Sequence, residues 1–371
     1  MIESIRSTRG IPFIVTAASF VVVVAGMRAA EALIVPFLLS VFLAIISAPP
    51  LFWLERKGLP RPLAMLAVIG GIVGILFVMG AIVGSSVDGF SRNLPAYQSR
   101  VQQGTNALIT WLNSYGIAVS QPELSKYLDA GAILGLAANT FNRLGAVLGN
   151  AFLIFLTVLF ILFEASSFPV KLRAIFGDDD IGRFKTFIDV VKRYFAIKTW
   201  TSLATGLAVA VCLKLIGVDF PILWGLLAFL LNYIPNIGSV IAALPAVLLA
   251  LVQLGFGSAI WTVIAYTAIN VGIGTFIEPR FMGHRLGLST LVVFISLVFW
   301  GWVLGPVGMF LSVPLTMTFK LAMESDDRTR WIAILLGSEA SAREALPSRG
   351  ETATLEAAGT ETSKSSVEGP P

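Results

Sequence analysis

The chain has 371 residues, of which 56% are hydrophobic and 13% charged, and its formal net charge is +4. Soluble domains carry about 25% charged residues, so this composition excludes an ordinary soluble protein and predicts an all-α polytopic membrane protein. Its single cysteine, Cys212, and single histidine, His284, exclude an internal disulfide and most Cys- or His-based metal sites.

Other counts exclude further classes of function. No lysine follows a glycine, so the GxxxxGK[ST] loop of ATP-binding chains is absent. The basic residues stand between apolar runs and do not gather on one face, which argues against nucleic acid as a partner. No nucleophile–base pair is visible either. We therefore expect no catalytic residues, no cofactor, no metal and no ATP binding in this chain.

Three apolar runs follow a short basic N-terminus at residues 1–10. They cover 11–27, 32–48 and 62–87, and we predict that 11–87 forms transmembrane helices 1–3. The first run also looks like a cleaved signal peptide, but the second run begins almost at once and favours an uncleaved pair of helices.

The middle of the chain alternates between polar and apolar segments. Residues 88–140 are rich in Asn, Gln and Ser, with apolar residues at helical spacing, and predict an extramembrane helical insert. Residues 141–163 predict transmembrane helix 4. Residues 164–199 combine dense charge with an apolar stripe, which predicts an amphipathic segment at the cytoplasmic surface.

The predicted transmembrane core at 200–323 contains two apolar runs, 222–254 and 286–323, that are too long for simple spans. At 1.5 Å per residue each reaches about 50 Å, whereas the hydrocarbon core is about 30 Å thick. Each run is interrupted near its centre, which predicts a re-entrant hairpin, with a kinked single span as the alternative. The tail at 324–371 has a composition that predicts disorder from about residue 339.

The distribution of Lys and Arg predicts the orientation. The N-terminus, the loop at 55–61 and the segment 164–199 are basic and are placed in the cytoplasm, which puts 88–140 on the outer face. Arg280 and Arg285 also fall on the cytoplasmic side if both long runs are hairpins, and outside if both are single spans. The rule therefore favours two hairpins that open to opposite faces, with both termini cytoplasmic.

The two breaks share a proline–glycine pattern. They read Pro235-x-x-Gly238-x6-Pro245 and Pro306-x-Gly308-x5-Pro314. Proline inside a helix leaves the carbonyl four residues earlier without its helical donor, and such backbone is tolerated at membrane depth only inside protein or beside a wet cavity. Paired broken helices point to a midplane binding site of a secondary transporter. Two structural kinks are the alternative.

Several spaced motifs resemble the autoinducer-2 exporter (AI-2E) family of bacterial membrane permeases. The likeness covers residues 10–325, and its motifs lie at 60–61, 231–238, 243–245, 278–283, 286–288, 299–308 and 313–316. Two places depart from the family pattern. Ser289-Thr290 stands where relatives often carry His-Pro, and residues 236–239 lack a common aromatic and proline.

The resemblance implies a multi-pass permease of the bacterial inner membrane that assembles as a homo-oligomer and exports small molecules. Some members of the family look like cation/proton antiporters. The implied partners are therefore a small-molecule or ion substrate, the lipid bilayer and further copies of the chain.

Polar and helix-breaking residues of the core are the candidate site. The candidates for substrate binding or gating are Asn232, Pro235, Asn236, Gly238, Ser239, Pro245, Asn270, Gly305, Pro306, Gly308 and Pro314. The amides and hydroxyl at the first break suit a polyol or a dehydrated cation, with capping of the broken helix as the alternative. Glu278 and Arg280 are candidates for a coupling-ion site, with a plain ion pair between them as the alternative.

Three functions are compatible with these features. The first is a secondary transporter that exports a small polar molecule by alternating access through the two broken hairpins. The second is a sodium/proton-type cation antiporter on the same scaffold, which would need Glu278 as a carrier. The third is a non-transporting membrane scaffold or assembly factor that uses the insert at 88–140 to contact a partner.

Overall fold

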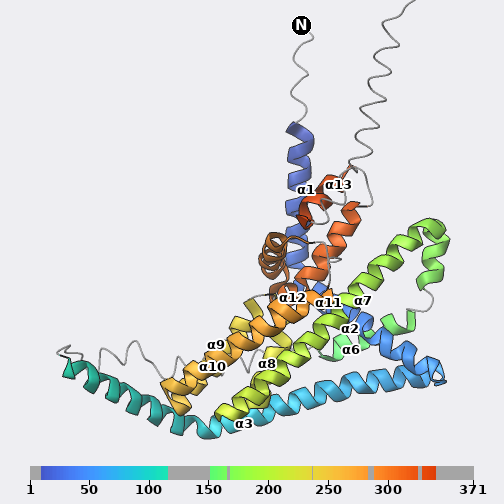
Figure 1. The fold of residues 1–371 in the computed structure, drawn as a ribbon. Helices are drawn as coiled ribbons and strands as arrows, with labels where there is room; N and C mark the ends of the chain where they lie inside the picture. The colour runs from blue at the N-terminus through green and yellow to red at the C-terminus, as the bar shows by residue number, and fades with distance from the viewer. Residues whose placement is uncertain are drawn as a thin grey trace, which may run out of the picture.

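The computed structural model describes residues 10–115, 151–164, 168–235, 237–282, 288–324 and 328–339, and their regular structure is helical apart from an isolated bridge between Leu288 and Gly337 (Figure 1). The helices are α1 (Gly10–Ala29), α2 (Glu31–Arg56), α3 (Arg61–Ser114), α6 (Ala151–Glu164), α7 (Phe168–Ile216), α8 (Pro221–Leu231), α9 (Ile237–Leu254), α10 (Phe256–Asn270), the π-helix η1 (Val271–Ile277), α11 (Glu278–Met282), α12 (Thr290–Glu324) and α13 (Arg330–Leu336). Six helices in the described part are long and apolar enough to cross a membrane. The predicted all-α polytopic membrane fold is confirmed.

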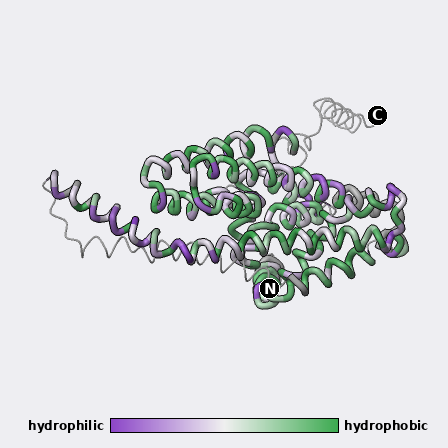
Figure 2. The backbone as a smooth tube through the Cα atoms, turned by 90° about the horizontal axis from the view of Figure 1, so that it is seen from below, coloured by the Kyte–Doolittle hydropathy of each residue, from purple (hydrophilic) through white to green (hydrophobic). Residues whose placement is uncertain are grey.

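Two helices are longer than the sequence analysis predicts. α3 has 54 residues and continues from the third apolar run into the polar segment after residue 87, and α7 has 49 residues and joins the charged segment to the apolar run after residue 199. Polar side chains do not break a helix when they face water. A switch from an apolar to a polar sequence therefore does not mark the end of a helix. Figure 2 shows the hydrophilic far part of α3 projecting beyond the other helices. The placement of 88–140 outside and 164–199 in the cytoplasm stays a prediction.

Parts of several predicted segments lie outside the described residues. These parts are residues 1–9 of the N-terminus, 116–150 of the insert and the fourth span, 165–167 of the charged segment, 236 and 283–287 of the core, and 325–327 and 340–371 of the tail. The fourth predicted transmembrane helix is described only as α6, from Ala151 to Glu164.

The first broken run folds back on itself as a hairpin of α8 and α9. The residues before α8 and the end of α9 lie side by side. Gln253 near the end of α9 accepts a hydrogen bond from the Asp219 N–H at 2.9 Å and donates one to the Gly217 carbonyl at 3.1 Å. α8 has 11 residues and is therefore about 16 Å long, roughly half the hydrocarbon thickness. Gly206 and Gly225 bring the α7 and α8 backbones together, since a Cβ on either would lie within 2.6 Å of the other's carbonyl oxygen.

The second broken run, within α12, is also a hairpin. Gly305 has φ 63° and ψ −153°, which is not helical, so the run divides into arms at 290–304 and 306–324. The indole N–H of Trp300 donates to Thr316 Oγ1 on the other arm at 3.1 Å. The Ser289 N–H before the first arm donates to the Leu336 carbonyl beyond the second arm at 3.1 Å, so the run begins and ends on the same side.

The far part of α3 is attached to the base of the first hairpin. The Tyr97 hydroxyl donates to Asp219 Oδ2 at 2.6 Å, and Gly89 leaves room for the ring of Phe220, whose φ is +59°. Burial, together with the hydrogen bond to the Asp219 carboxylate, raises the pKa of the Tyr97 hydroxyl, which lies beyond the predicted span of α3. The indole N–H of Trp224 donates to the Asp219 carbonyl at 2.8 Å and holds the start of α8 in the same junction.

Candidate functional site

The two hairpins touch at their broken ends. Tyr233 at the tip of the first hairpin is buried and packs against Phe310 of the second, with ring centroids 4.7 Å apart. Its hydroxyl donates to Thr199 Oγ1 of α7 at 2.8 Å. Phe195, one turn earlier on α7, packs against Phe42 of α2 with ring centroids 4.7 Å apart. The first tip is therefore held against α7 and the second hairpin, and α7 in turn packs against α2.

A glycine near each tip lets the two arms of its hairpin touch through their backbones. A Cβ on Gly238 would lie 1.8 Å from the Leu231 carbonyl oxygen, and one on Gly308 would lie 1.9 Å from that of Trp300. The Ile234 N–H donates to the Leu231 carbonyl at 2.9 Å. A tight turn therefore supplies a donor to the very carbonyl that the first proline leaves without its helical partner.

A buried ion pair lies beside the first tip. Lys198 Nζ of α7 and Glu278 Oε1 at the start of α11 are 2.7 Å apart, and the two side chains are 6% and 15% exposed. Among the described residues Glu278 pairs with Lys198, which lies 80 residues earlier in the chain, and not with Arg280 as predicted; Arg280 is exposed. Glu278 follows directly on the π-helix Val271–Ile277, and π-helices are rare and frequently mark functional sites.

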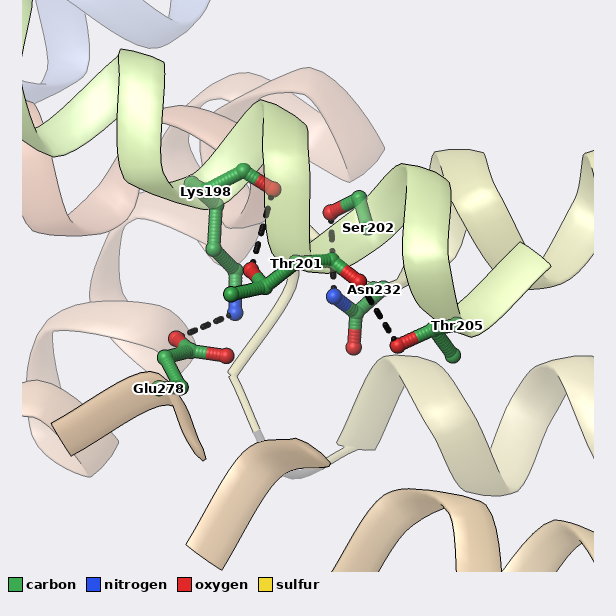
Figure 3. Close-up of polar contacts among 6 residues, drawn as sticks. All are labelled: Lys198, Thr201, Ser202, Thr205, Asn232 and Glu278. Carbon is green, nitrogen blue, oxygen red and sulfur yellow. Dashed lines mark hydrogen bonds and ion pairs between the residues drawn. The ribbon is translucent and has the colours of Figure 1, made fainter. Parts of the chain in front are cut away.

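Polar side chains continue from this pair along one face of α7. As whole residues, Lys198, Thr201, Ser202 and Thr205 are at most 5% exposed, and their spacing places them on one helical face. Asn232, the residue that ends α8, donates from Nδ2 to Ser202 Oγ at 2.9 Å (Figure 3). We call these four side chains, together with Asn232 and Glu278, the polar row.

The other candidates of the first hairpin and of α10 are placed in the turn or in the helices, apart from one that lies outside the described residues. Asn236 lies outside the described residues. Pro235 is half-buried in the turn, Ser239 is half-buried in the first turn of α9, and Pro245 is buried within that helix. Asn270 is half-buried at the end of α10, immediately before the π-helix.

The candidates of the second break form its tip and one of its arms. Gly305 is the turn itself, and a Cβ there would lie 3.0 Å from the Glu31 carboxylate oxygen at the start of α2. Pro306 is exposed beside the turn, whereas Pro314 is buried in the second arm. The structure therefore brings the tips together, while the two later prolines pack within the helices.

The sequence analysis missed Lys198, Thr201, Ser202 and Thr205. Lys198 belonged to the predicted surface segment, and the three hydroxyl residues stood at the start of an apolar run. A signal was present, because four polar residues at positions i, i+3, i+4 and i+7 on one helix predict a buried polar face. Their partners, however, come from distant parts of the chain.

An apolar cavity of about 220 Å³ lies next to Phe42 and Phe310, the rings that contact Phe195 and Tyr233. Apolar side chains from α2, α3, α6, α8 and α12 line it, among them Phe42, Leu230 and Phe310. Such a cavity stays dry, so it offers a polar solute no hydrogen-bond partner. Within the described residues, no group of three or more His, Cys, Asp and Glu side chains is placed to hold a metal ion.

The sequence model described as AI-2E family transporter matches residues 17–325 of the chain. The chain belongs to the AI-2E family. The AI-2 transport protein TqsA of Escherichia coli K12 is 40% identical over 338 residues, which cover 91% of this chain and 98% of TqsA. A putative transport protein of Haemophilus influenzae is 38% identical, covering 86% of this chain and 94% of its own length, and the putative transport protein YhhT of E. coli K12 is 36% identical, covering 88% and 95%.

These comparisons confirm the family that the motifs predict. The AI-2E model and the relatives are described as transporters or transport proteins, which points to transport and not to catalysis. Together with six helices fit to span a bilayer, they make this AI-2E member a multi-pass membrane permease.

Proposed function

We propose that this chain is a secondary transporter that exports a small polar molecule across the bacterial inner membrane, with the polar row as its binding surface and the two hairpins as its moving part. The observation that carries the proposal is a row of buried polar side chains, with an ion pair at one end, beside the broken tip of α8. Polar groups inside a membrane protein are expensive and mark transport pathways. Broken helices that meet there are the usual setting of a transporter site.

The depth of the polar row supports this role. Lys198 lies about 27 Å along α7 from Ile216, and Asn232 lies about 17 Å from the start of α8 at Pro221. With the base of the first hairpin at the outer face, the row lies inside a hydrocarbon core of about 30 Å, towards its cytoplasmic side. A solute bound there has to be released by movement of one or both tips.

The chemistry of the row favours a neutral, hydrogen-bonding solute. The charges of Lys198 and Glu278 cancel, so the row carries no net charge for an ionic substrate to neutralise. The remaining groups are one amide and several hydroxyls, which suit a polyol. The relative named AI-2 transport protein makes autoinducer-2 the first compound to test.

Cation/proton antiport is the second candidate, and the buried Glu278 carboxylate favours it. In that mode the transported cation would take the place of the Lys198 ammonium beside Glu278. The two modes differ in what drives movement, because antiport links sodium flux to proton flux, whereas export of a neutral solute needs no carboxylate as carrier.

Two substitutions in the row test the proposal in proteoliposomes. Asn232→Leu and Ser202→Ala should each lower the flux of autoinducer-2 by about tenfold or more, which corresponds to losing one or two hydrogen bonds to the solute. Ser296→Ala is the control, because Ser296 is also buried and its hydroxyl donates to the Val293 carbonyl of its own helix. Unchanged flux in both row variants would refute the proposed binding surface. Sodium-driven proton movement that disappears in Glu278→Gln would favour antiport instead.

Labelling of single cysteines tests the orientation of the hairpins. In a Cys212→Ser background, cysteines at Asp219 and Leu254 flank the first hairpin, and cysteines at Ser289 and Ser338 flank the second. We expect the first two to react from the outer face only and the second two from the cytoplasmic face only. Labelling of either pair from opposite faces would mean that the run crosses the bilayer once.

A further inference from the structure

A groove of about 530 Å³ lies between α1 and the first arm of α12, away from the polar row. We propose that this groove binds an anionic phospholipid, with the phosphate on Arg28 and one acyl chain along α1. The residues that carry the argument line the groove and are Phe20, Val24, Ala25, Arg28, Phe299 and Trp302.

The charge of the groove selects an anion. Arg28 is its only charged residue, and its guanidinium carbon lies 4.7 Å from the centroid of the Trp302 ring. None of the ion pairs recorded among the described residues includes Arg28. The nearest acid along the chain, Glu31, directs a carboxylate oxygen towards Gly305 at the second tip. A guanidinium stacked on an aromatic ring still has its N–H donors available, and their fork matches a phosphate.

The shape of the groove matches a lipid that lies along the helix. Phe20, Val24 and Arg28 are spaced by four residues and line up along one side of α1, so that the apolar strip below the guanidinium is about 12 Å long. The rings of Phe20 and Phe299 are stacked at 6.3 Å between centroids at the far end. The groove thus has a cationic end beside a tryptophan ring and an apolar length for a hydrocarbon chain.

A zwitterionic lipid fits this site less well. Its phosphate carries the same charge, but its own ammonium cancels that charge, so the unpaired charge of Arg28 stays uncompensated. A lipid with a net anionic headgroup, such as phosphatidylglycerol, neutralises the charge of Arg28. Basic pockets between transmembrane helices are known to hold anionic headgroups. The bound lipid would also join α1 to the arm that leads to the turn at Gly305.

Quenching of tryptophan fluorescence by brominated lipids tests the site without any transport measurement. The full chain is reconstituted with brominated phosphatidylglycerol or brominated phosphatidylcholine. The contribution of Trp302 to the fluorescence is the difference between the wild type and Trp302→Phe. We expect the Trp302 share to be quenched at a several-fold lower mole fraction of the anionic lipid. Trp261 on α10 is the control, since it is 64% exposed and does not line the groove, and its share should respond equally to both lipids.

Two variants separate the roles of charge and shape. Arg28→Gln should remove the preference for phosphatidylglycerol, and Ala25→Phe should reduce the Trp302 quenching by both lipids because it fills the groove and leaves the charge in place. Raising the salt to about 1 M, where the Debye length is about 3 Å, should weaken the preference in the unaltered protein and needs no variant to fold. Equal quenching of Trp302 by the two lipids in the wild type would overturn the proposal. An undiminished preference in Arg28→Gln would overturn it as well.

Discussion

Lys198→Met is expected to abolish transport and to lower the free energy of unfolding by about 3–5 kcal/mol, the usual loss when one partner of a buried ion pair is removed. The Glu278 carboxyl would lie inside the bundle without the ammonium that is 2.7 Å from it in the wild type. Both side chains are at most 15% exposed, so water cannot replace the lost partner. Thermal unfolding in detergent measures the stability, and flux into proteoliposomes measures the transport.

The double variant Lys198→Met with Glu278→Gln separates stability from function. It removes both charges and should recover most of the stability, because uncharged residues can replace a buried pair at little cost. Transport should stay lost if the pair moves or binds during the cycle. Lys320→Met is the control, since the Lys320–Glu324 pair spans 3.4 Å with Glu324 43% exposed, and it should change the stability by less than about 1 kcal/mol. A fully stable and active Lys198→Met would show that the pair matters for neither property.

Gly238→Ala and Gly308→Ala are expected to destabilise the folded protein by about 3 kcal/mol or more, at or above the upper end of ordinary overpacking. The added Cβ would stand 1.8 Å and 1.9 Å from a carbonyl oxygen of the facing arm. The obstacle is backbone and not a flexible side chain, so the hairpin arms must separate. Thermal unfolding and the fraction of monodisperse protein after extraction measure the effect.

Gly74→Ala provides the matched comparison for the two tip glycines. Gly74 lies within α3, and a Cβ there would meet nothing within 4 Å. Alanine is the better helix former, so this variant should be neutral or more stable by about 0.5–1 kcal/mol. If Gly238→Ala and Gly308→Ala behaved like Gly74→Ala, the arms of the hairpins would not pack as closely as the structure shows.

The sequence alone determined the membrane class, the two broken runs and the residues at their tips. These features are local, because composition decides whether a segment is soluble in lipid and proline decides where a helix loses its hydrogen bond. Gly238, Gly305 and Gly308 could therefore be placed at the breaks from their spacing to proline. The ends of α3 and α7 could not be predicted, since a helix continues from an apolar into a polar stretch without any local signal to stop.

Only the tertiary structure decided what the tips face. Glu278 has Arg280 two residues away, yet its partner is Lys198, and Asn232 finds Ser202 on a different helix. A buried charge pairs with the opposite charge that packing brings into the same dry space, and sequence distance has no part in that choice. The polar row therefore exists only once α7, the tip of α8 and the π-helix before Glu278 are packed together.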